Sequence, residues 1–359
     1  MKFLAVLTVR NEAAYLLEWL AHHRAVGFTD FLVYSNDCQD GTDTMLDRLE
    51  ALGQLTHVRN DGPHHKGGIQ FTAMKLADKH PLVKTADWIL TLDADEFVNI
   101  HLGDHTLPAL LSALPEATAI TLTWRLFGCN GIARYRDAPV TEQFTMAAPE
   151  VMHWPWRASM FKTLFRNDGT YRKLGVHRPR NPDESRIGAA RWFDGHGREL
   201  ESKFHKGRIF SPYGRPNTGL AQINHYALGS MENFVMKAAR GRAVHSDHMM
   251  GLDYWVERNF NVVRDVTIQS LAPARTTGLA ALKADAELAS LHDDAVAWRH
   301  QRFEELMLDE PFRALFGRLL QTPSSQPLHP NAARFLTRYA VRGRARASTE
   351  ILLDPPATG

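Results

Sequence analysis

The sequence predicts an α/β protein built on a mostly parallel, mixed sheet flanked by helices, with a helical extension at the C-terminal end. Up to residue 97, apolar runs of strand length alternate with amphipathic stretches of helix length. Short polar loops follow the apolar runs, at the edge where parallel sheets bind ligands. From residue 231 onward, helical periodicity replaces the alternation. These three observations favour a ligand-binding sheet followed by a set of helices.

The first part of the chain contains four predicted strands, over residues 3–9, 30–34, 55–59 and 88–92. The helices between them are expected to begin at Glu12 and after Thr42, and the third to run through Ala77. We expect the Asn11 side chain to cap the first of these helices. Gly27, which tolerates the left-handed conformation, should end it.

The later part of the chain is less regular. A further strand is predicted over residues 119–124, and the Arg-, Gly-, Pro-, Trp- and His-rich stretch 125–222 is interpreted as loops that cover the sheet. Helices are predicted over residues 231–240, 252–268 and 282–320, the last broken near Glu310-Pro311.

The composition is that of an ordinary globular protein. The chain has 359 residues, of which 44% are hydrophobic and 23% charged, so it can bury a substantial core. The net charge of +2 gives no strong field that would favour nucleic acid as a partner. Cys38 and Cys129 lie far apart in the sequence and fit no metal spacing, so the reducing cytoplasm is the expected location.

Two stretches bear on membranes. Residues 1–7 resemble the start of a secretion signal, but the polar sequence from Thr8 interrupts it, and no apolar run is long enough to cross a bilayer. The basic stretch 334–346 interleaves Phe335 and Tyr339 with arginines. We interpret it as a solvated helix, with peripheral association at the inner face of the membrane as the alternative.

The stretch Asp93-Ala94-Asp95 is the first candidate site, because it follows the buried strand 88–92 directly. Two carboxylates that converge repel each other unless a cation offsets their charge. Hard oxygen ligands at a sheet edge suit Mg²⁺ or Mn²⁺ with a phosphate as co-ligand. The alternative is a strand end followed by a helix whose first turn carries Asp95 and Glu96 to suit its dipole.

Five groups of residues occur together in an order that is typical of one enzyme family. They are residues 8–12 (TVRNE) with 18–20 (EWL), 34–37 (YSND) with 40–42 (DGT), 92–97 (LDADEF), Trp124 with 127–131 (FGCNG), and 225–226 (HY) with 230–234 (SMENF) and 237–241 (KAARG). On these residues the chain resembles the family 2 glycosyltransferases of the GT-A fold, a Rossmann-like α/β fold, and particularly the bacterial branch near the family 92 enzymes. The resemblance covers roughly residues 1–245.

The resemblance implies transfer of a sugar from a nucleoside diphosphate sugar to a hydroxyl of a saccharide or glycoconjugate, with Mn²⁺ or Mg²⁺ at the diphosphate. It also implies a role in assembling a cell-surface polysaccharide or another glycoconjugate. On this resemblance, residues 1–125 form the nucleotide-sugar half, 126–245 the acceptor-binding and catalytic half, and 246–359 a helical extension.

The resemblance also assigns residues. Asp95 corresponds to the direct metal ligand, Asp93 to the carboxylate that contacts the ribose or the metal, and His225 to the histidine that completes the metal or diphosphate contacts. The other residues expected to bind the donor or acceptor are Thr8, Asn11, Glu12, Ser35, Asn36, Asp37, Lys66, Gln70 and His177. A solvated loop lysine is the alternative for Lys66, and a histidine held by backbone groups is the alternative for His177.

Two departures leave alternatives open. Many relatives carry two acidic residues where this chain has Ser35-Asn36, so Asp37 is the alternative contact for the donor base. An inverting enzyme needs a carboxylate near the acceptor hydroxyl, and we expect Asp194 to be this base. The competing carboxylates are Glu142, Glu150 and Asp183.

Several other residues have both a functional and a structural interpretation. Trp154, Trp156 and Trp192 could stack on sugar rings or cover the core. Arg178 and Arg180 could receive an acidic acceptor or a diphosphate, or lie in solvent. His245 and His248 have metal-like spacing, but we interpret them as a helix surface.

Two other functions fit the same sheet. A nucleotidyltransferase attacks phosphorus with a similar metal, but the Gly-rich, Lys- or Arg-bearing loop expected directly after the first strand is absent from residues 10–16. A relative that binds sugar or nucleotide without turnover is the non-catalytic alternative.

Overall fold

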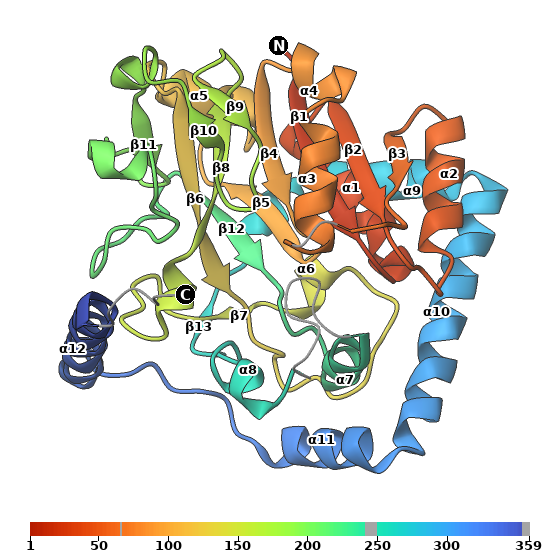
Figure 1. Ribbon diagram of the computed structural model, residues 1–359. Coiled ribbons are helices and arrows are strands. Elements are labelled where there is room, and N and C mark those ends of the chain that lie inside the picture. Colours follow the sequence, from red (N-terminus) through yellow and green to blue (C-terminus); the bar gives the residue numbers. More distant parts are fainter. Residues whose placement is uncertain (65–66, 241–249, 354–359) are drawn as a thin grey trace, which may run out of the picture.

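A sheet of nine strands runs through the protein in a computed structural model that describes residues 1–64, 67–240 and 250–353 (Figure 1). Eight strands follow the order β3-β2-β1-β4-β8-β6-β12-β5, and β11 also pairs with β6. Their bounds are β1 Phe3–Val9, β2 Asp30–Ser35, β3 Thr56–Arg59, β4 Trp88–Leu92, β5 Glu96–Ile100, β6 Ala119–Leu126, β8 Phe161–Arg166, β11 Trp192–Asp194 and β12 Ala221–His225. Five of the eight strand pairings are parallel, as predicted.

The strand β1 is buried on both faces of the sheet. Phe3 and Leu7 belong to one hydrophobic cluster, which includes α1 (Ala13–Val26), whereas Leu4 and Val6 belong to another, which includes α3 (Ile69–Ala77). Successive side chains of a strand point to opposite faces, so one apolar run supplies both layers. Helices therefore cover both sides of the sheet, as the sequence predicted.

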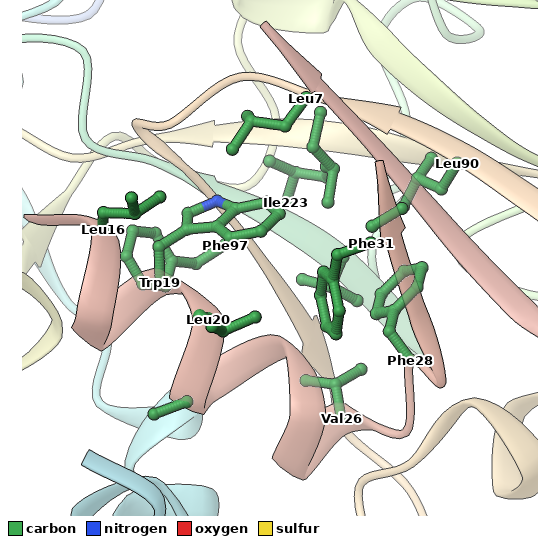
Figure 2. Packing of buried hydrophobic residues seen from close by; sticks show 14 of the residues in the cluster. Leu7, Leu16, Trp19, Leu20, Val26, Phe28, Phe31, Leu90, Phe97 and Ile223 are labelled. Carbon is green, nitrogen blue, oxygen red and sulfur yellow. The ribbon is translucent and has the colours of Figure 1, made fainter. Parts of the chain in front are cut away.

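Trp19 anchors α1 to the sheet, as Figure 2 shows. Its ring packs edge-on against Phe31 of β2, and its indole Nε1 donates to the backbone oxygen of Glu96, 3.0 Å away. Phe97 lies close to Trp19 in the same cluster. This contact fixes the start of α1 relative to the turn that carries Asp93 and Asp95.

The cap of α1 differs from the prediction. Asn11 does not bond to the helix, because its side chain binds Gln39 and its backbone adopts a positive φ of 54°. Instead, the Asp40 carboxylate accepts from the amide of Ala13, and the Thr42 hydroxyl accepts from the amide of Glu12. The loop after β2 therefore caps the helix that follows β1.

The C-terminal helices run from the back of the sheet to its lower edge in Figure 1. Among them, α9 (Ala272–Lys283) packs against α1. The next helix, α10 (Ala286–Met307), packs against α2 (Thr42–Ala51) and also contacts α7 (Met231–Arg240). Arg48 and Asp285 join α2 to α10 by an ion pair of 2.6 Å. The helices are α7 Met231–Arg240, α8 Leu252–Val256, α9 Ala272–Lys283, α10 Ala286–Met307, α11 Glu310–Gln321 and α12 Pro330–Leu353.

The predicted helix over residues 252–268 was wrong. The helix α8 ends at Val256, and the chain then forms β13 (Val263–Arg264), which pairs with β7 (Met146–Ala147). Asn259 accepts a bond from the amide of Cys129, which holds this segment away from a helical path. Tertiary pairing therefore overrides the local helical periodicity.

The remaining elements are short and lie on the periphery or in the loops. They are α4 Pro81–Thr85, α5 Leu107–Ala113, α6 Val140–Gln143, β9 Tyr171–Lys173 and β10 Arg180–Pro182, with 3-10 turns at Trp156–Ser159, Ile187–Ala189, Ser202–Phe204 and Thr267–Leu271. Among the described residues, we find no helix with the length and apolar character needed to span a bilayer. The expected boundary at residue 125 falls inside β6, so the first two parts of the chain share one sheet.

Candidate active site

A cleft of about 440 Å³ opens at the carboxyl ends of β1, β2, β4 and β12. It is the edge at which parallel sheets bind ligands, because the loops after successive strands converge there. Most of the residues selected from the sequence line this cleft. They are Thr8, Glu12, Asn36, Gln70, Asp93, Asp95, His177 and His225.

Asp93 lies at the start of the turn between β4 and β5 and is held by two donors. Gln70 on α3 donates to one carboxylate oxygen at 3.0 Å, and the ammonium of Lys162 on β8 donates to the other at 2.9 Å. Lys162 also lies 3.3 Å from the buried carboxyl of Glu96, which accepts from the indole of Trp124. Burial lowers the pKa of Lys162, but Asp93 and Glu96 outweigh this effect and raise it above its ordinary value. Burial raises the pKa of Glu96 to about 8 despite this ammonium, so Lys162 is a buried cation whose charged partner is Asp93.

Asp95 lies at the other end of the same turn and faces a different set of groups. The ammonium of Lys237 on α7 is 2.5 Å from one carboxylate oxygen, and Nε2 of His225 is 3.6 Å from the other. Burial alone would raise the pKa of Asp95, but Lys237 and His225 outweigh it and hold this pKa well below its ordinary value. Asp95 is therefore ionised in the structure and already paired with a cation.

The strand β12 brings His225 to Asp95. It lies between β5 and β6, antiparallel to the first and parallel to the second, with His225 opposite Glu96 and Leu126. The amide of Tyr226 donates to the backbone oxygen of Asp95 at 2.8 Å. Burial lowers the pKa of His225, so its imidazole is neutral near pH 7 and can act as a ligand.

The lining of the cleft is rich in cations that the sequence analysis did not assign. Arg240 pairs with Glu12 and also donates to the backbone oxygen of Arg10. The cationic side chains that line the cleft are Arg10, Arg157, Lys237, Arg240 and Arg258, against the three carboxylates of Glu12, Asp93 and Asp95. With the histidines neutral, the lining therefore carries a positive surplus that suits a ligand with several negative charges.

A divalent cation fits two of the three predicted ligands. Two ligands at right angles on a Mn²⁺ or Mg²⁺ ion lie about 3 Å apart, close to the 3.6 Å between Asp95 and His225. Asp93 is directed instead toward Gln70 and Lys162, and no group of three or more His, Cys, Asp or Glu side chains that could hold a metal occurs in the described part of the chain. The set of Asp93, Asp95 and His225 is thus not assembled. An ion held by Asp95 and His225 would need ligands from the substrate, and Lys237 would have to leave Asp95.

Several predicted donor-binding residues do not reach the cleft. The Ser35 hydroxyl is buried and bonds to His57 at 2.7 Å. Asp37 is exposed beyond the end of β2, and Asn11 lines the neighbouring cavity instead. Lys66, His245 and His248 lie outside the described residues.

The structure does not bring Asp194 to the cleft. Its side chain is fully buried, where it accepts from the amides of His196 and Arg198 and pairs with the guanidinium groups of Arg198 and Arg215. This arrangement closes a hairpin, and a base must instead reach the acceptor hydroxyl. We therefore do not retain Asp194 as the base.

The three competing carboxylates are also engaged elsewhere. Glu142 pairs with Arg275, Glu150 accepts from the hydroxyl of Thr218, and Asp183 pairs with Arg172. None of the three lines the cleft as far as the described residues define it. Their interactions are those of structural carboxylates.

The tryptophans and arginines with two interpretations take structural positions. Trp192 is buried in the second core cluster, with the guanidinium of Arg178 above its ring at 5.0 Å. Trp154 and Trp156 pack against each other, with ring centroids 4.8 Å apart. Arg180 donates to the backbone oxygen of Leu174. These residues cover the core and the loops.

Lys162 and Lys237 are the main residues that sequence reasoning missed. Lys162 interrupts the apolar strand 161–165, and a lysine at a buried strand position is a sign of an internal ion pair. Lys237 falls in one of the stretches used for the resemblance, but its proximity to Asp95 depends on how α7 packs.

The first half of the chain is similar in sequence to proteins of one known family. A model of glycosyltransferase family 92 matches residues 5–191, which is more than half of the chain. A family 92 protein of Oryza sativa subsp. japonica is 26% identical over 150 residues, covering 40% of this chain and 24% of the rice protein. A family 92 protein of Ricinus communis is 24% identical over 155 residues, covering 39% and 26%. The chain therefore spans about a quarter of the length of these curated relatives.

Solved structures give weaker likenesses. TarS of S. aureus has a TM-score of 0.32 and 16% identity, covering 66% of this chain and 38% of that one. Glucosyl-3-phosphoglycerate synthase of Mycobacterium tuberculosis, solved with Mn²⁺, UDP and glucosyl-3-phosphoglycerate, has a TM-score of 0.24 and 18% identity, covering 34% and 44%. Because TM-scores this low carry no weight, neither structure bears on the site.

Proposed function

The chain belongs to glycosyltransferase family 92, and from this membership we propose that it transfers a sugar from a nucleoside diphosphate sugar to a hydroxyl of a saccharide or glycoconjugate. The premise is that the chain is a glycosyltransferase with a mixed α/β sheet of the predicted GT-A type. The two curated relatives are plant proteins, and the expected bacterial branch stays an expectation. The observation that carries the proposal is the cleft, in which Asp95, His225 and a surplus of cations meet at the carboxyl edge of the sheet.

The proposed donor lies along this edge with its diphosphate beside Asp95. Thr8 and Asn36, at the ends of β1 and β2, line the part of the cleft where the base and ribose would bind. The ammonium of Lys237 and the guanidinium of Arg258 line the part where the diphosphate would bind. A diphosphate that leaves with extra negative charge is stabilised by fixed cations, because they need no reorganisation during the reaction.

We propose that Asp95 and His225 hold a Mn²⁺ or Mg²⁺ ion together with the donor diphosphate. The ion would neutralise negative charge on the departing diphosphate. Asp93, which Gln70 and Lys162 fix in place, would contact the ribose and not the ion. His177 lines the same cleft with burial lowering its pKa to about 4, so it would meet a substrate as a neutral donor or acceptor.

The biological setting also remains a proposal. From the resemblance, we propose that the product is a cell-surface polysaccharide or another glycoconjugate, made at the cytoplasmic side of the membrane. We keep the three-part division, with residues 1–125 for the donor, 126–245 for the acceptor and 246–359 as a helical extension, as a description of roles.

The proposal is tested by the thermal stability of the full chain with UDP, GDP, CDP or ADP, each with Mn²⁺ and with a chelator. A ligand that binds the folded state raises the melting temperature by mass action. We expect one nucleoside diphosphate to give a shift that Mn²⁺ increases, and Asp95→Asn to lose the Mn²⁺-dependent part. Asp293→Asn, an exposed carboxylate on α10, is the matched control and should keep it. A full Mn²⁺-dependent shift in Asp95→Asn would contradict the assignment.

Product analysis separates the proposal from the two other functions. Slow hydrolysis of the matching nucleotide sugar to free sugar and nucleoside diphosphate supports sugar transfer. Release of pyrophosphate from a nucleoside triphosphate would instead indicate a nucleotidyltransferase. Binding without any turnover would indicate the non-catalytic relative.

A further inference from the structure

A second cavity, of about 450 Å³, adjoins the proposed donor cleft. The shared wall is formed by Arg10, Glu12, Ala94, Asp95, Lys237 and Arg240, which line both spaces. The rest of the cavity is formed by α1, α7 and α10 together with the loop before α6. A ligand in this cavity would thus lie beside the proposed diphosphate site.

Arg299 on α10 lines this cavity as a buried cation and forms no ion pair with the residues that the structure describes. Only 4% of its surface is exposed, and its Nε is buried without a partner. Its guanidinium lies 4.7 Å and 4.9 Å from the ring centroids of Tyr15 and Tyr135, and it donates to the side-chain oxygen of Asn233. Burial raises the pKa of Tyr15 to about 12, so that ring is neutral. All the groups that hold Arg299 are therefore uncharged.

Two more arginines of the cavity lack carboxylate partners. Within residues 1–64, 67–240 and 250–353, neither Arg10 nor Arg136 forms an ion pair, and the Nε of Arg10 is also buried without a partner. Burying a charge without an opposite charge is unfavourable, and proteins usually supply a partner. The three carboxylates of the lining pair with other cations: Glu12 with Arg240, Asp95 with Lys237 and Glu305 with Arg302. The buried Arg299 and the half-buried Arg10 therefore keep charges that a ligand can pair.

The walls of the cavity are aromatic. Tyr15, Tyr135 and Trp298 line it together with Phe144 and Tyr226. Aromatic faces pack against the apolar faces of sugar rings, while guanidinium forks bind carboxylates and phosphates through two parallel bonds. The lining therefore combines the groups that recognise a ring with those that recognise an anion.

We propose that this second cavity binds the acceptor, and that the acceptor is an anionic saccharide whose carboxylate or phosphate binds Arg299, with Arg10 and Arg136 nearby. The proposal rests on the proposed function, since it makes the cavity the acceptor site of the transfer. It also gives α10, in the C-terminal extension, a direct role in substrate recognition. The shared wall places the acceptor next to the departing diphosphate.

The proposal is tested by isothermal titration of the full chain with D-glucuronate, D-glucose 6-phosphate, D-glucose and inorganic phosphate. We expect at least one of the two sugar anions to bind at least tenfold more tightly than glucose. Glucuronate alone would identify a carboxylate acceptor, and glucose 6-phosphate alone a phosphorylated one. Equal binding of glucose and both sugar anions would overturn the proposal, as would phosphate binding as tightly as glucose 6-phosphate.

Substitutions of the arginines in the second cavity test where the sugar anion binds. Arg299→Met should weaken the sugar anion at least tenfold and leave nucleoside diphosphate binding unchanged, because Arg299 does not line the donor cleft. Arg313→Met, which removes an exposed arginine of α11, is the matched control. Arg136 is exposed, so Arg136→Met should fold even if Arg299→Met does not, and it should weaken the same ligand. Unchanged binding of the sugar anion in Arg136→Met and in a folded Arg299→Met would sink the proposal.

The two proposals fail in different ways. A chain that binds sugar anions at Arg299 but no nucleoside diphosphate would refute the proposed function and leave an anion site. A chain that binds the nucleoside diphosphate and shows no preference for sugar anions would refute only the acceptor site.

Discussion

The two cavities on either side of the Asp95 wall differ in how their charges are compensated. In the donor cleft, Asp93 and Asp95 each have a lysine within 3 Å. In the second cavity, Arg299 is more deeply buried than either carboxylate and is held by neutral groups. The first cavity thus carries its own counter-ions, whereas the second leaves a charge for a ligand to complete.

The difference shows what each cavity must do before a substrate arrives. A paired carboxylate is stable in the empty protein, and an ion that binds Asp95 must displace Lys237 from it. Unpaired arginines cost stability in the empty protein, and a ligand recovers that cost on binding. In the proposed donor cleft, Asp95 would therefore exchange Lys237 for another partner. In the second cavity, Arg299 would gain a partner that it lacks in the empty protein.

The largest expected effect comes from removing the compensation of Asp93. Lys162→Met would leave the Asp93 carboxylate without its cation beside the buried carboxyl of Glu96, and we expect a loss of about 3–5 kcal/mol in the free energy of unfolding. Urea denaturation measures it. Adding Asp93→Asn to Lys162→Met should recover part of the loss, since a neutral amide then replaces the unpaired carboxylate. A loss no larger than that of Lys203→Met, at an exposed lysine, would show that the compensation is unimportant.

A second prediction concerns His22, a buried side chain that needs no counter-ion because burial keeps it neutral. Burial lowers the pKa of His22 from 6.5 to about 4. Between these pH values the His22 side chain takes up a proton in the unfolded chain but not in the folded chain. The contribution of His22 to the free energy of unfolding is therefore fully present above pH 6.5 and is lost as the pH drops toward 4. For one such group the loss is roughly 3 kcal/mol.

This pH dependence can be measured by urea denaturation from pH 7 to pH 4. His22→Gln should flatten the decline, even if its stability at pH 7 is lower. His329→Gln, at an exposed position before α12, should keep the wild-type profile. The same slope in His22→Gln as in the wild type would rule out His22 as its source.

The smallest effect is expected at Asp95. While Lys237 is bound to this carboxylate, it should exclude a divalent ion until a diphosphate draws the ammonium away. Lys237→Met should therefore bind Mn²⁺ in the absence of nucleotide about tenfold more tightly than the wild type does, or about 1.4 kcal/mol. The signal of free Mn²⁺ in electron paramagnetic resonance measures this. Equal or weaker Mn²⁺ binding by Lys237→Met would contradict the competition.

Local patterns were enough to predict much of the fold. The bounds of β1, β4 and α7 agree with the prediction, because each combines a clear period with a clear stop signal. The helix expected over residues 252–268 failed, since pairing of β13 with β7 decides that segment. The expected cap from Asn11 failed for the same kind of reason, as Asp40 comes from another loop.

The site was predictable where chemistry follows directly from a strand end. Thr8, Asn36, Asp93 and Asp95 each stand just inside or beyond the carboxyl end of a strand, and the topology brings those ends together. The cations were not predictable in this way. Lys162 and Lys237 reach the carboxylates from a strand and a helix far along the chain, and only the packing shows it.

The placement of β12 has a consequence for dividing this protein. The stretch that matches the family ends at residue 191, yet β5 and β6 have β12 as the strand between them, and it begins only at Ala221. A fragment cut at the end of the matched stretch would expose two strand edges to aggregation and would lack His225. The unit that sequence comparison detects is therefore shorter than the smallest piece expected to fold and work by itself.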